Sequence, residues 1–116
     1  MAYTPTRLYQ GQPNGVETTT TPGILSAAVP SATTWIVKQV VLCNTSTTTA
    51  VSISLSVVPS GNTGGNANRI ISGYSLAASQ TTTFDLSIVM STGDFMTAVA
   101  SSASTITVTI AGVVIT

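Results

Sequence analysis

The sequence predicts an all-β fold: a single antiparallel β-sandwich of seven to eight strands, jelly-roll or immunoglobulin-like, with an extended N-terminal arm. Short runs alternate apolar and polar residues with the period of two that gives a strand one buried and one wet face. These runs recur at the regular spacing of sandwich strands. No run combines a 3.6-residue apolar period with helix caps. At 116 residues the chain makes one domain, with an arm over residues 1–15 and the sandwich over 16–116.

The segment at the centre of this prediction is residues 34–44, TWIVKQVVLCN. It is the longest apolar-rich run, and it holds the only Trp, the only Cys and the only Lys. Both of its period-two faces are mostly apolar, so we expect a central strand covered on both sides. Cys43 is then predicted to be a buried, reduced and unligated thiol. The short linker 45–49 and the alternating run 50–58 predict an antiparallel hairpin with this strand.

The remaining strands follow from shorter alternating runs between turn residues. Two precede the central strand, over 16–21 and 24–29, and four follow 50–58, over 68–74, 81–90, 95–100 and 105–115. The pair Ala111-Gly112 predicts a bulge in the last of them. Strict alternation predicts that Val51, Ile53, Leu55 and Val57 line the core opposite Phe84, Leu86 and Ile88.

The N-terminal arm leaves alternatives open. It is an edge strand docked on the sandwich, an arm that packs on a neighbouring subunit, or a disordered tail. We favour the second narrowly, because aromatic residues and Arg are enriched where protein surfaces meet. The Gly-rich loop 60–68 is the other exposed contact candidate. The predicted partner-contact residues are Tyr3, Arg7, Leu8, Tyr9, Asn62 and Asn66.

The composition limits the possible partners. Three Lys and Arg balance three Asp and Glu, whereas Thr and Ser together supply 37 of the 116 residues. So few cations argue against binding to nucleic acid and against an electrostatic membrane anchor. No apolar run has the length of a spanning helix, and the N-terminus lacks a signal-peptide pattern, so we expect synthesis in the cytoplasm. A protein without net charge tends to associate, which suits a part of an assembly.

The residues give no support for catalysis or for a bound cofactor. There is no His, and the single Cys and three acids are scattered, so we predict no metal site and no catalytic residue. Lys38 is the only base for a Ser–Lys pair, and it lies on the predicted central strand. The loop 60–68 lacks the Lys-Ser/Thr ending of a phosphate cradle. Sugar binding would need a platform of aromatic rings, and only Trp35 and Tyr74 are placed for one. We therefore predict that the chain is not an enzyme.

Nearly the whole chain resembles a family of virion proteins. The segments AYTPTRLYQGQP, WIVKQVVLCNT, SISLSVVPSG, NRIISGYSLAASQTTTFDLSIVMSTGD and VTIAGVV are similar to small β-sandwich virion structural proteins of tailed bacteriophages. This resemblance implies a non-enzymatic structural protein in the virion, most simply a capsid decoration or minor capsid protein that forms homo-oligomers or packs on other virion proteins. A collar or tail component and a host-surface glycan-binding module remain the alternatives.

Overall fold

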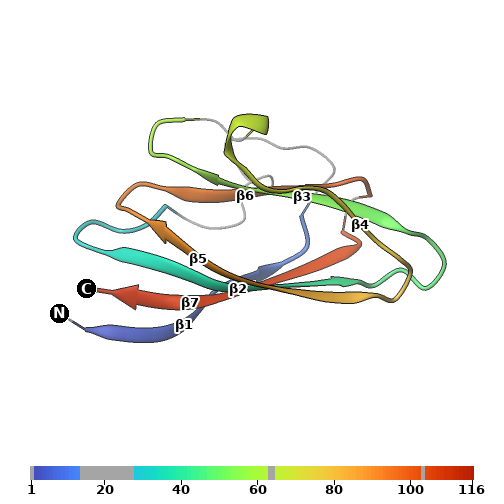
Figure 1. The fold of residues 1–116 in the computed structure, drawn as a ribbon, viewed down its shortest axis with the longest axis horizontal. Coiled ribbons are helices and arrows are strands. Elements are labelled where there is room, and N and C mark those ends of the chain that lie inside the picture. The colour runs from blue at the N-terminus through green and yellow to red at the C-terminus, as the bar shows by residue number, and fades with distance from the viewer. Residues whose placement is uncertain (1, 14–27, 63–64, 103) are drawn as a thin grey trace.

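The computed structural model describes residues 2–13, 28–62, 65–102 and 104–116. Within these residues the chain forms seven strands in two sheets, and every pair of neighbouring strands is antiparallel (Figure 1). The predicted all-β sandwich is confirmed. A short 3₁₀ turn, η1, spans Asn66–Asn68. The strands are β1 (Tyr3–Gly11), β2 (Thr34–Asn44), β3 (Val51–Val58), β4 (Arg69–Leu76), β5 (Thr81–Met90), β6 (Phe95–Ala100) and β7 (Ile106–Ile115).

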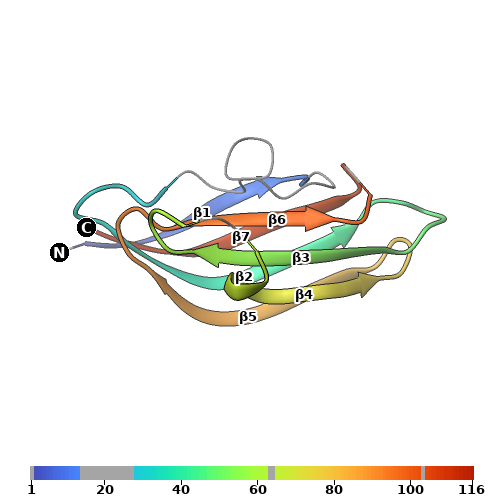
Figure 2. The same ribbon diagram turned by 90° about the horizontal axis from the view of Figure 1, so that it is seen from above.

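The strand order distinguishes the two predicted sandwich types. One sheet has the order β1-β7-β2-β5 and the other β4-β3-β6 (Figure 2). In an immunoglobulin-like constant domain the first strand pairs with the second, whereas here β1 pairs with β7. The described strands therefore follow the jelly-roll order. The strand predicted over 16–21 lies outside the described residues, as does the one predicted over 24–29 except for its last two residues, which are not in a strand.

The predicted central strand is an inner strand of its sheet, but the described residues cover only one of its faces. Val37, Val40 and Leu42 are fully buried, whereas Lys38 and Gln39 are exposed. The strand pairing shifts between Val37 and Gln39, which leaves Lys38 as an extra residue in β2. This bulge turns Val37 and Val40 to the same side. The prediction that both faces are covered is therefore wrong. It assumed one unbroken period of two along the strand, whereas the bulge leaves Lys38 and Gln39 both on the exposed face.

The predicted hairpin between residues 34–44 and 50–58 is also wrong, because β2 and β3 lie in different sheets. The buried side chain of Asn44 holds the corner between them. Its Nδ2 donates hydrogen bonds to the carbonyl oxygens of Thr49 (3.0 Å), Leu76 (3.2 Å) and Ala77 (3.2 Å). Its Oδ1 accepts one from the backbone N–H of Ser46 at 3.0 Å. These bonds fix the crossover and tie it to the end of β4.

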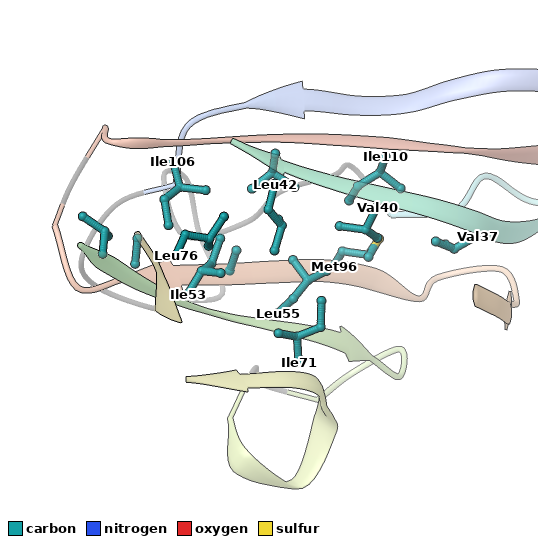
Figure 3. Packing of buried hydrophobic residues seen from close by; sticks show 14 of the residues in the cluster. Val37, Val40, Leu42, Ile53, Leu55, Ile71, Leu76, Met96, Ile106 and Ile110 are labelled. Carbon is teal, nitrogen blue, oxygen red and sulfur yellow. The ribbon is translucent and has the colours of Figure 1, made fainter. Parts of the chain in front are cut away.

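The core lies between the sheets and consists of the inward residues of both (Figure 3). Burial of Val51, Ile53 and Leu55 on β3 is confirmed, with Val57 partly buried beside them. The predicted partners on β5 are only partly buried, because β5 is an edge strand. The ring of Phe84 meets that of Tyr74 edge-on at 5.2 Å, so β5 faces β4 there rather than β3.

The irregularity predicted at Ala111-Gly112 lies in the two neighbours of β7. Register shifts leave Leu8 as an extra residue in β1 and Lys38 as one in β2, both beside this dipeptide. A Cβ at Gly112 would clash with the backbone carbonyl of Ile36 and would lie 3.0 Å from Leu8 Cδ1. Glycine therefore lets the bulged strands close on β7 at this level.

Replacing Gly112 with alanine should lower the free energy of unfolding by about 1–3 kcal/mol, because the added methyl overpacks this point. Gly65→Ala is the matched control, since nothing lies within 4 Å of a Cβ at that position. Urea titration of both variants measures the difference. Equal stability of the two variants would contradict the close approach at Gly112.

Candidate interaction surface

Most polar side chains whose chemistry the sequence raised have structural roles. The Asp94 carboxylate accepts hydrogen bonds from the backbone N–H groups of Ser60 (3.0 Å) and Ser91 (2.9 Å), which holds two turns together. Lys38 Nζ donates to Ser87 Oγ at 3.1 Å on the sheet surface. Among the described residues, no group of three or more His, Cys, Asp or Glu is placed to hold a metal ion. Over the same residues, no helix is long and apolar enough to span a membrane.

The N-terminal contact candidates lie on β1, which is the edge strand of the four-stranded sheet and pairs with β7. Of the three interpretations of the arm, the described structure has the edge strand. Tyr3 is 67% exposed and Arg7 is exposed, whereas Leu8 and Tyr9 pack partly buried against the core. The accessible candidates on this strand are therefore Tyr3 and Arg7. Contact with a partner stays a prediction for all four residues.

The two loop candidates lie elsewhere on the molecule. Asn62 and Asn66 are both exposed in the connection between β3 and β4. Figure 1 shows η1 on the outer side of the three-stranded sheet, away from β1. At the end of this connection, Arg69 Nη1 donates to Ser56 Oγ at 2.7 Å. The structure thus does not bring the predicted arm and loop contacts into one site.

A surface that the sequence did not predict lies on the outer face of the four-stranded sheet. Cross-strand pairing places four apolar residues side by side, one from each strand. On β2, Trp35 and Val37 lie before and after Ile36 and turn inward, so Ile36 and the residues paired with it across the sheet face outward. Val89 is 62% exposed. We call this set the apolar row: Pro5, Val113, Ile36 and Val89.

Lys38, the exposed extra residue of β2, follows the apolar row toward the other end of the sheet, and the next cross-strand row also carries charge. Pairing places Arg7 beside Ala111, Ala111 beside Gln39, and Gln39 beside Asp85. Arg7 and Asp85 are exposed and stand on the two edge strands of the sheet. Gln39 Nε2 donates to Asp85 Oδ1 at 3.5 Å. We call Arg7, Ala111, Gln39 and Asp85 the charged row.

The far end of this face is mostly polar, with Val41 as an outward apolar residue between Thr109 and Thr83. Gln10 Nε2 donates to Thr109 Oγ1 at 3.3 Å, and Gln12 Nε2 donates to Thr107 Oγ1 at 3.4 Å. Cys43 pairs with Thr107 on this face and is a free, half-buried thiol. The prediction that it is buried is therefore wrong. Its neighbours in sequence, Leu42 and Asn44, take the inward positions, so Cys43 points outward.

Sequence reasoning missed this face because its apolar character depends on register. The outward positions of β7 are Thr107 and Thr109 before Ala111, and Val113 and Ile115 after it. The run VVI at 113–115, where polar alternation stops, is the one sequence signal of the change. No protein-family model, curated protein or solved structure matches the chain.

The partly buried phenol of Tyr9 allows its burial in the structure to be tested in solution. Burial raises the pKa of its phenol above the ordinary value of 10.0. In a pH window above about 10 the folded chain keeps a proton that the unfolded chain has lost, so the free energy of unfolding falls as pH rises through the folded pKa. Tyr9→Phe should reduce this fall. Urea titrations of both proteins at pH about 8 and about 11 measure it, and an identical fall would contradict the burial of the phenol.

Proposed function

We propose that the chain is a non-enzymatic structural component of a bacteriophage virion, as a capsid decoration or minor capsid protein that self-associates or packs on the shell. The observation that carries this proposal is the outward-facing apolar row, in which Pro5 and Val89 are exposed and Ile36 and Val113 partly buried, on a protein with only six charged residues. The class of assembly follows, as an expectation, from the resemblance of the sequence segments to small virion sandwich proteins.

The surface chemistry favours an assembled protein over a free one. Apolar side chains that lie together and exposed mark sites of association, because covering them removes apolar area from water. Few charges remain to keep separate copies apart, since the net charge is zero. Solubility then depends on hydroxyl and amide groups, which pair with one another along the same sheet face.

The glycan-binding alternative receives less support from the aromatic rings. Sugar platforms use exposed ring faces, but Trp35 and Tyr74 are partly buried and pack against the core. Tyr74 and Phe84 also pack edge to face, so the edge of one ring already covers a face of the other. A collar or tail tip holds far fewer copies of a protein than a shell does, so copy number distinguishes these locations.

The test is the amount of this chain in purified particles. Particles banded in a density gradient and washed in high salt should retain it, and quantitative mass spectrometry should count hundreds of copies relative to the major shell protein. About a dozen copies would instead indicate a collar or a tail tip and overturn the decoration role. Loss of the chain from intact particles would overturn the structural role altogether.

A further inference from the structure

We propose that the outer face of the four-stranded sheet binds the same face of a second copy, about a two-fold axis that runs parallel to the strands between β7 and β2. The partner is thus a second copy of this chain, and the interface is isologous. This inference rests on the self-association in the proposed function, and it specifies the face and the two-fold symmetry of that association.

The first argument is complementary charge. A two-fold axis along the strands places each β1 over the partner's β5 and each β7 over the partner's β2. Arg7 and Asp85 stand in the same cross-strand row, on opposite sides of this axis. Each Arg7 therefore faces an Asp85 of the other copy, which gives two opposite-charge contacts per dimer.

The second argument is that the same axis matches the apolar row with itself. Pro5 faces Val89 of the other copy, and Val113 faces Ile36 of the other copy. The most exposed apolar position of the row, Val89, is thereby covered. A two-fold axis across the strands, placed at the charged row, would instead set apolar residues against the hydroxyl and amide groups of the far end.

The geometry allows both matches at once. With strands about 4.8 Å apart, β1 and β5 lie about 7 Å on either side of the axis. Packed sheets cross at about 30°, which displaces facing positions on these strands by about 4 Å, within the reach of an arginine side chain. Arg7 would lose little intramolecular bonding when it turns to the partner. Within the described residues its side chain donates one hydrogen bond, from Nη1 to Gln10 Oε1 at 3.2 Å.

The third argument is area. Four strands about 4.8 Å apart and the 11 residues of β2 at about 3.3 Å each give a face of roughly 700 Å². Standard stable interfaces bury about 800 Å² on each partner. The face is thus near the size that a stable dimer needs, with an apolar part, a charged row and a polar remainder.

Charge reversal with rescue tests this dimer in the full-length chain. Sedimentation velocity over a range of concentrations should give a monomer–dimer equilibrium for the wild type. Arg7→Asp and Asp85→Arg should each weaken dimerisation about tenfold or more, because like charges then face each other twice. The variant that carries both substitutions should recover dimerisation, since opposite charges face each other again. Val89→Thr should also weaken the dimer, because it places a hydroxyl in the apolar row.

Two controls separate the interface from general effects. Asn62→Asp combined with Asn66→Asp changes net charge by the same amount as Arg7→Asp, but on exposed residues of another surface, and should leave the dimer intact. Thermal melting of each variant at low concentration identifies any that fail to fold. A wild-type chain that stays monomeric at every soluble concentration overturns the inference, as does a double variant no better than the single ones.

The proposed function can fail separately from this interface. Wild-type dimers that do not enter particles would contradict the virion role and leave the interface standing. Particles that retain normal amounts of the chain while the purified chain stays monomeric would overturn the interface and leave the virion role standing.

Discussion

Replacing Leu55 with alanine should lower the free energy of unfolding by about 2–5 kcal/mol, the range found for leucine truncations in well-packed cores. Leu55 is fully buried on β3, the middle strand of the three-stranded sheet, and lies among side chains from both sheets (Figure 3). Its removal takes methyl groups out of an interior that cannot fully close around the gap. Urea titration followed by circular dichroism measures the change.

Leu86→Ala is the matched control, because the same truncation falls on a partly buried residue of the edge strand β5. We expect a clearly smaller loss there. A loss at Leu55 below about half a kcal/mol, or one no larger than at Leu86, would mean that β3 does not turn this face to the core.

Replacing Asn44 with aspartate should destabilise the fold by about 2–3 kcal/mol, although the side chain keeps its size. The amide nitrogen of Asn44 donates to three backbone carbonyls, and the residue is 1% exposed. A carboxylate accepts hydrogen bonds but donates none, so it would face those carbonyl oxygens unpaired in a buried corner.

The control for Asn44 is Asn62→Asp, which makes the same chemical change at an exposed position. Its stability should stay within about half a kcal/mol of the wild type. Should Asn44→Asp prove as stable as Asn62→Asp, the corner would not depend on the amide, and the crossover between the sheets would need another explanation.

Alternation predicted the strands well where turn residues bounded them. The runs 81–90 and 95–100 coincide with β5 and β6, and the inward positions Ile53 and Leu55 are buried as expected. Local pattern carries this information because each side chain alternates between the two faces of its strand.

Sheet membership and the outer surface could not be obtained in this way. A short linker suits a hairpin and a crossover equally, and the pairing of β2 with β5 and β7 distinguishes them. The apolar row requires the register of four strands, including the bulges at Leu8 and Lys38. A single extra residue in one strand changes which side chains share a face.

One measurement tests most directly the combined proposal that this chain enters particles as a dimer formed through the outer face of its four-stranded sheet. Particles produced without the chain are incubated with purified wild type, with Arg7→Asp, and with the double variant Arg7→Asp, Asp85→Arg, and the bound copies are counted after washing. The wild type and the double variant should bind in large and similar numbers, and Arg7→Asp should bind far fewer copies. Equal binding by all three would contradict a need for this dimer in particle binding, and the absence of wild-type binding would contradict the structural role itself.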